Sequence, residues 1–196
     1  MEYQSGRQVI SSENSSVSNI NIHVQPDKSV YFVSLGCPKN LVDSQVMLGL
    51  LKSDEYSVIQ SPETADVIVI NTCSFIESAK AESIDTILEM AEYKDTGNCK
   101  ALVVAGCLPQ RYKSQLLKEI PEVDLFIGTG EYHRIAELVN WARKGELPER
   151  AYVNKPAFIH TEAHPRIQTG EFFSAYLKIS EGCNRRCSFC IIPTLR

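Results

Sequence analysis

Apolar runs and helix-like stripes alternate along the chain from residue 29 onward. The run 29–36 is mostly apolar, as in a buried strand, and the segment after it carries Val42, Val46 and Leu51 at helical spacing. The run 66–71 is dominated by Val and Ile, which is typical of a central parallel strand covered on both faces. The whole pattern predicts strands at 29–36, 56–60, 66–71, 101–106 and 123–127, and helices at 41–52, 75–93, 110–120 and 131–143.

Strands that alternate with helices at this spacing predict an α/β fold, a flavodoxin-like doubly wound parallel sheet over 29–144. Residues 1–28 have few large apolar side chains and are expected to form a disordered extension. Residues 145–170 combine prolines with mixed polar residues, which indicates a linker. A further strand is predicted at 173–180, inside a last segment, 171–196, that begins a second domain.

Charge and composition limit the classes of function. The net charge is -4, and charged residues make up 22% of the chain, a balance typical of globular proteins. An acidic chain disfavours a protein whose main role is to bind nucleic-acid phosphates. The apolar runs fall far short of the ~20 residues that span a bilayer, and the Ser- and Asn-rich start lacks the apolar core of a secretory signal. We therefore expect a cytoplasmic protein with no membrane partner.

Three cysteines near the end of the chain have the spacing of a metal-cluster loop. Seven cysteines is a high count for a reducing compartment, where repeated thiols usually serve metal or redox chemistry. The loop thiols, Cys183, Cys187 and Cys190, have the spacing C-x3-C-x2-C. Three thiolates can hold three irons of a cubane cluster and leave the fourth iron open to a cofactor or substrate. The alternative is a structural zinc site, which requires four ligands, but only three cysteines and no nearby histidine are present.

A second set of cysteines follows the ends of predicted parallel strands. We call Cys37, Cys73 and Cys107 the strand-end thiols. In a doubly wound sheet the carboxyl ends of the strands meet at a common crevice where ligands bind, so these thiols are expected to converge on a second cluster with an open iron. The alternative is that buried cysteines act as small hydrophobic residues and stand at strand ends by chance. Cys99 precedes its strand, at the opposite edge of the sheet, and is expected to have no metal role.

The segments around both sets of cysteines resemble the amino-terminal part of the radical S-adenosylmethionine (radical-SAM) methylthiotransferases. The resemblance covers 29–196 and rests on Leu-Gly-Cys-Pro-Lys-Asn at 35–40, Asn-Thr-Cys at 71–73, Ala-Gly-Cys at 105–107, Glu-Gly-Cys at 181–183 and Ile-Ile-Pro at 191–193. It implies a methylthiotransferase amino-terminal domain at 29–144 and the start of a truncated radical-SAM βα barrel at 171–196. The Pro-Lys-Asn after the first cysteine resembles the members that modify an aspartate of the twelfth protein of the small ribosomal subunit.

The resemblance also implies cofactors and partners. It implies that the strand-end thiols carry a sulfur-donating 4Fe–4S cluster. It implies that the loop thiols carry a second 4Fe–4S cluster that binds S-adenosyl-L-methionine, with Phe189 as a cofactor-binding residue. The substrate would be the ribosomal protein, which would receive a methylthio group on the β-carbon of the aspartate. An electron donor such as flavodoxin or ferredoxin would be the other partner.

Two other functions stay open at this point. One is a tRNA adenosine methylthiotransferase, the single case in which nucleic acid would be a partner, and the other is a non-catalytic metal-binding module. Only residues 191–196 follow the last cysteine, whereas a βα barrel needs about 200 residues or more, so we expect a fragment that does not turn over alone. Asn40 and Asp43 stand at the start of a predicted helix, where a capping role is the default expectation.

Overall fold

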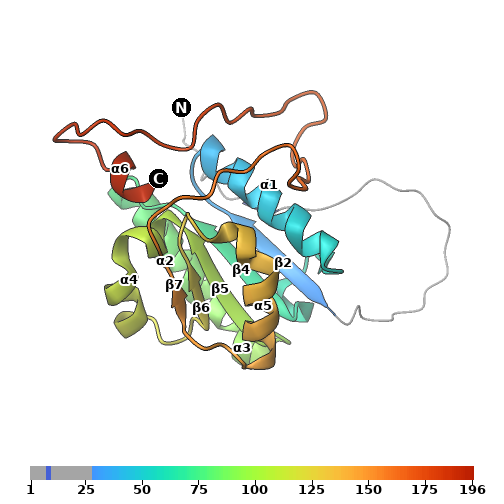
Figure 1. Ribbon diagram of the computed structural model, residues 1–196. Helices are drawn as coiled ribbons and strands as arrows, with labels where there is room; N and C mark the ends of the chain where they lie inside the picture. The colour runs from blue at the N-terminus through green and yellow to red at the C-terminus, as the bar shows by residue number, and fades with distance from the viewer. Residues whose placement is uncertain (1–7, 10–27) are drawn as a thin grey trace, which may run out of the picture.

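The computed structural model describes residues 8–9 and 28–196 (Figure 1). The disordered extension expected for 1–28 therefore falls almost entirely outside the described residues. Within it, strand β1 (Gln8–Val9) pairs antiparallel with the end of β2 (Ser29–Ser34), a pairing that the apolar pattern did not predict.

The sheet confirms the predicted doubly wound parallel fold. Its parallel strands are β2, β3 (Ser57–Val58), β4 (Val67–Thr72), β5 (Ala101–Gly106), β6 (Leu125–Ile127) and β7 (Ala151–Tyr152). They lie in the order β3-β2-β4-β5-β6-β7, which is the flavodoxin-like order with one strand added at the edge. The chain leaves β2 for β3 on one side and returns at β4 on the other. Because the direction of winding changes there, the carboxyl ends of β2 and β4 border the crevice at which such sheets bind ligands.

Helices cover both faces of the sheet, with α1 and α5 on one face and α2 and α4 on the other (Figure 1). The helices are α1 (Pro38–Ser53), α2 (Glu77–Ala91), α3 (Tyr93–Thr96), α4 (Cys107–Glu119), α5 (Ile135–Lys144) and α6 (Ile192–Leu195), with short 3-10 turns at Pro62–Thr64 and Tyr132–Arg134. None of the helices in the described part of the chain is both long and apolar enough to cross a membrane.

Alternation along the central strands produces two separate cores. Phe32 of β2 faces the core that contains Leu138 of α5, and the next residue, Val33, faces the core that contains Ile87 of α2. All four side chains are fully buried. This is the expected result of a strand buried on both faces, since successive side chains point to opposite sides of a sheet.

Two predicted elements differ from the structure. Residues 173–180 form no strand, so that prediction is wrong, and Leu177 and Ile179 are exposed there. A strand needs a neighbour to accept its backbone hydrogen bonds, and no strand of the described sheet pairs with this segment. Conversely, β7 lies inside the predicted linker and pairs parallel with β6 through Phe126–Ala151 and Ile127–Tyr152. After β7 the chain crosses the carboxyl end of the sheet without regular structure until α6 (Figure 1).

Candidate functional site

The three strand-end thiols lie at the carboxyl ends of three adjacent strands. Cys37 stands between β2 and α1, Cys73 directly follows β4, and Cys107 begins α4 immediately after β5. The predicted helix at 110–120 thus begins earlier than expected, at the cysteine itself. Since β4 lies between β2 and β5, the three residues border one crevice at the point where the winding of the sheet changes direction.

Two glycines let the backbone pass close to this crevice. Gly36 has a φ of 92°, and a Cβ on it would lie 2.5 Å from the Cβ of Cys73 and 3.0 Å from its Sγ. Gly106 has a φ of 99°, and a Cβ there would lie 2.4 Å from Oδ1 of Asn71. Both positions need a positive φ and lack space for a side chain, so only glycine fits them without strain.

The strand-end thiols differ in exposure and affect one another electrostatically. Cys37 is exposed, whereas Cys73 and Cys107 are buried. Burial raises the pKa of Cys107 to about 11, against the lowering effect of the nearby Arg196 guanidinium, and the other two thiols raise it further. Burial also raises the pKa of Cys73, with a smaller upward contribution from Cys37. The thiols therefore lie close enough to affect one another's charge, and a metal that binds them must displace protons from the two buried ones.

The sulfur atoms of the strand-end thiols are not all close enough to one another to share a single zinc ion. Tetrahedral zinc with Zn–S bonds of about 2.3 Å would bring its sulfur ligands to about 3.8 Å from one another. No three cysteines of the described chain have all their sulfur atoms within 4.8 Å of one another. A cubane cluster is larger than one ion and accepts three thiolates at wider spacing. The donor set of the strand-end thiols is therefore compatible with an iron–sulfur cluster.

Buried polar side chains hold the loops that carry these thiols. The Asn40 side-chain amide donates to the carbonyl of Leu35 at 2.7 Å, and the Asn71 amide donates to the carbonyl of Asn40 at 2.9 Å. The backbone N–H of Cys73 donates to Oγ of Ser83 at 3.1 Å. Asn40 is thus buried inside the first turn of α1 and makes no cap, so the capping expectation for it is wrong; the residue at the cap position is Cys37.

The loop thiols lie in an irregular segment that precedes α6. Cys183 and Cys187 are exposed, Cys190 is half-buried, and the backbone N–H of Cys190 donates to the carbonyl of Cys187 at 3.1 Å. Among the described residues the three loop sulfur atoms do not all lie within 4.8 Å of one another, and Phe189 is 90% exposed. The cluster on these thiols and the cofactor-binding role of Phe189 therefore stay predictions.

A buried network of four charges joins the last segment to α1. The residues are Asp43, Lys178, Glu181 and Arg196. The Lys178 ammonium lies 2.5 Å from Asp43 and 2.6 Å from Glu181, and the Arg196 guanidinium pairs with the same two carboxylates. Asp43, the second residue expected to cap α1, is instead 4% exposed at its side chain and serves as an ion-pair partner.

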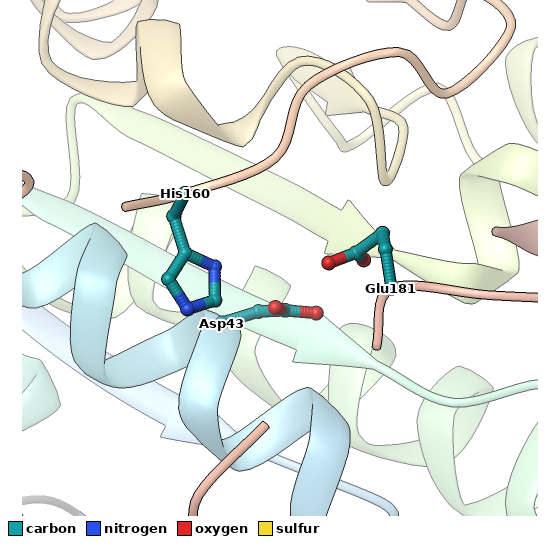
Figure 2. Close-up of side chains that lie close together, drawn as sticks. All are labelled: Asp43, His160 and Glu181. Atoms are coloured by element: carbon teal, nitrogen blue, oxygen red, sulfur yellow. The ribbon is translucent and has the colours of Figure 1, made fainter. Parts of the chain in front are cut away.

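His160 adds a third potential metal ligand beside the two carboxylates of this network. Figure 2 shows Asp43, His160 and Glu181 pointing toward one another, and their ligand atoms lie within 4.8 Å. Both carboxylates are already neutralised by the two buried cations, however, and the His160 ring faces the hydroxyl of Tyr132 at 3.2 Å. Although burial opposes its ionisation, Glu181 has its pKa lowered by Lys178 and Arg196. The arrangement is an ion-pair network rather than a cation site.

Sequence reasoning did not find this network. The two cations lie 135 and 153 residues after Asp43, and no motif or helical spacing connects them. Lys178 and Glu181 are three residues apart, but in a segment without helix this spacing carries no signal. Only the fold, which brings the last segment across the carboxyl end of the sheet, reveals the contact.

Comparison with known proteins adds a family and several relatives. The model of a family described as "Uncharacterized protein family UPF0004" matches residues 29–128. A protein of Citrifermentans bemidjiense named ribosomal protein uS12 methylthiotransferase RimO is 55% identical over 170 residues. Proteins of the same name from Geotalea uraniireducens and Geobacter sulfurreducens are each 52% identical to the chain. Each match covers 86% of this chain but only 38% of the relative, so the chain spans less than two fifths of the length of these proteins.

Proposed function

The chain belongs to the family described as UPF0004, and from that premise we propose that it forms the amino-terminal part of a methylthiotransferase that acts on ribosomal protein uS12. The observation that carries the proposal is the meeting of three thiols at the carboxyl ends of β2, β4 and β5. The substrate comes from the names of the relatives, and the Pro-Lys-Asn that follows Cys37 supports it over tRNA.

Each set of thiols has a distinct task in this proposal. The strand-end thiols hold one 4Fe–4S cluster, and the loop thiols hold a second, at which S-adenosyl-L-methionine binds beside Phe189. When bound, these groups supply the radical chemistry and the sulfur for a methylthio group on the β-carbon of an aspartate. Burial of Cys73 and Cys107 keeps water from the inner side of the first site, and Gly36 and Gly106 let the backbone close around it. We place the enzyme in the cytoplasm, where flavodoxin or ferredoxin would provide electrons.

Metal content after reconstitution tests the two cluster sites. The chain is reconstituted without oxygen with iron and sulfide, in parallel with a Cys37→Ala/Cys73→Ala/Cys107→Ala variant and a Cys99→Ala control. We expect about eight irons per chain, about four in the triple variant and no change in the control, since each cubane holds four irons. Stoichiometric zinc with little iron would contradict the proposal and favour a non-catalytic metal-binding module.

A chimera tests the substrate. Residues 29–196 replace the matching segment of the Geobacter sulfurreducens relative, and the product is assayed with uS12 and with tRNA. We expect one methylthio group on the uS12 aspartate by mass spectrometry and none on tRNA, while the 196 residues alone give no product. Modification of adenosine in tRNA would overturn the substrate assignment, and turnover by the 196 residues alone would overturn the expectation that they are an incomplete enzyme.

A further inference from the structure

The Arg196 side chain connects the ion-pair network to the strand-end thiols. Its Nη1 pairs with Asp43 and lies 3.0 Å from Oε1 of Glu181. Its Nη2 donates to Oδ1 of Asn40 at 3.3 Å and to Sγ of Cys107 at 3.8 Å. The side chain is only 2% exposed, so water screens these interactions little. One guanidinium thus contacts two carboxylates of the network and a proposed cluster ligand.

The backbone around Arg196 fixes the direction of this side chain. The N–H of Arg196 donates to the carbonyl of Ile192 within the turn of α6, and the Thr129 hydroxyl donates to the carbonyl of Leu195 at 2.5 Å. On the other side, a Cβ on Gly182 would lie 2.9 Å from the Cβ of Arg196. Gly182 is the residue before Cys183, so the start of the cysteine loop packs directly against the arginine.

We propose that Arg196 is a positioning residue that raises the electron affinity of the cluster on the strand-end thiols through its hydrogen bond to the sulfur of Cys107. The proposal rests on the proposed function, because it requires a cluster at that site. Gly182 packs against Arg196 and precedes the loop that carries the second set of thiols. By holding Arg196 in place, this loop therefore influences the reduction potential of the first cluster.

Electrostatics gives the direction of the effect. A thiolate-ligated cluster gains negative charge when it is reduced, and hydrogen bonds and positive charge at a ligand sulfur stabilise the reduced form. The guanidinium is suited to this role because its planar fork can donate to Asp43 and to the sulfur at once. Although burial opposes its charge, Arg196 has its pKa raised by Asp43 and Cys107, so the side chain stays a cation at this site.

The test measures the midpoint potential of the first cluster alone. The 196-residue chain carries Cys183→Ser, Cys187→Ser and Cys190→Ser in every sample, so that only the strand-end thiols bind a cluster. Arg196→Met removes the cation and the donor while keeping a long side chain, and Arg196→Lys keeps the cation without the fork. Arg111→Met is the matched control, because Arg111 donates to the carbonyl of Ser74, next to Cys73, and not to a sulfur.

We expect about four irons in each sample. The midpoint potential should be more negative in both Arg196 variants than in the parent chain, and the shift should be larger for Arg196→Met than for Arg196→Lys. Arg111→Met should leave the potential unchanged. A second comparison displaces the arginine without changing it. Gly182→Ala should shift the potential in the same direction, whereas Gly170→Ala should not, since a Cβ on Gly170 meets no atom within 4 Å.

The outcomes separate this inference from the proposed function. If the parent chain binds no cluster, the proposal that the strand-end thiols hold one is wrong. If the parent binds about four irons and neither Arg196 variant shifts the potential, the inference is overturned while the site stands. Should Arg196→Met fail to fold, Arg196→Lys and Gly182→Ala decide: a negative shift supports the inference, and an unchanged potential overturns it.

Discussion

Individual cysteines in this protein have environments that predict different reactivity. Cys99 and Cys107 are buried, and burial raises the pKa of each to about 11, so at pH ~8 only about one thiol in a thousand is the nucleophilic thiolate. Cys37, Cys183 and Cys187 are exposed. In the metal-free chain we expect iodoacetamide to modify these three first and Cys99 and Cys107 about a hundredfold more slowly, as followed by peptide mass spectrometry.

Denaturation provides the control for this labelling experiment. In urea all of the cysteines should react at similar rates, because burial is lost. Rapid labelling of Cys99 in the folded chain would contradict its burial and reopen the question of its role. The expectation that Cys99 has no metal role stays a prediction until iron content is measured in its alanine variant.

The glycine before the first thiol offers a second test at the residue scale. Gly36→Ala would force a Cβ to 2.5 Å from Cys73 at a φ of 92°, so we expect a loss of about 2–4 kcal/mol in the free energy of unfolding and reduced iron binding. Gly145→Ala is the matched control, because Gly145 also has a positive φ but a Cβ there meets nothing within 4 Å. It should cost only about 1–2 kcal/mol. Urea unfolding of both variants measures the difference, and equal losses would mean that contact with Cys73 plays no part.

At the scale of secondary structure, the central strands could be predicted and the edge elements could not. β2, β4 and β5 are continuous apolar runs because both their faces are buried, and this pattern survives in the sequence alone. β7 is only two residues long, too short to show an apolar pattern in the sequence, and it forms because it pairs with β6. The segment 173–180 has a strand-like composition, but none of the strands in the described residues pairs with it, and composition does not reveal a missing neighbour.

Asp66 joins the beginnings of three central strands and makes the sheet sensitive to acid. Its carboxylate accepts hydrogen bonds from the backbone N–H and the hydroxyl of Ser29, the first residue of β2. It also pairs at 2.6 Å with Lys100, which directly precedes β5. Burial opposes ionisation, but the hydrogen bonds from Lys100 and Ser29 outweigh it and lower the pKa of Asp66 below 3.8. A carboxyl whose pKa is lowered on folding contributes its full stabilisation at pH values above its pKa in the unfolded chain. This contribution is lost as the pH falls through its pKa in the folded chain.

We therefore expect Asp66→Asn to cost about 1–2 kcal/mol at neutral pH, since half of the Lys100 side chain is exposed and weakens the pair. The difference from the parent chain should shrink as the pH falls below about 4. Urea unfolding from about pH 6 to about pH 3 measures it. Asp85→Asn, at an exposed position of α2, is the control. A difference that stays constant over this range would show that ionisation of Asp66 does not stabilise the sheet.

At the scale of the whole molecule, the thiol site combines what the sequence predicts with what only the fold reveals. The positions of Cys37, Cys73 and Cys107 follow from the strand pattern, because parallel strands end at a common edge. The contact of Asp43 with Lys178 and Arg196 does not, because it depends on how an irregular segment crosses that edge. Individual side-chain contacts fix the position of segments without regular structure, and the periodicity of a sequence does not predict such contacts.

The same ion pairs are expected to hold the last segment against the sheet. Lys178 and Arg196 have side chains 4% and 2% exposed, so removing a carboxylate partner leaves buried charge uncompensated, at a cost of about 3–5 kcal/mol. This cost falls on the contact between segments, because the Asp43 carboxylate pairs with Lys178 and Arg196 of the last segment and is not part of either apolar core. Asp43→Asn should therefore release the segment and leave the sheet folded.

Limited trypsin digestion can detect this release. In Asp43→Asn we expect cleavage after Lys178 to accelerate at least about tenfold while fragments that span β2 to β6 persist, because the lysine becomes accessible once one of its two carboxylate partners is lost and the segment is released. Asp54→Asn is the matched control: Asp54 pairs with Lys28 at 3.0 Å in a half-exposed setting, and its loss should not change cleavage after Lys178. If both variants are cut at the parent rate, the network does not hold the segment. If the whole Asp43→Asn chain is digested instead, Asp43 supports the sheet itself, and the two parts of the molecule unfold as one.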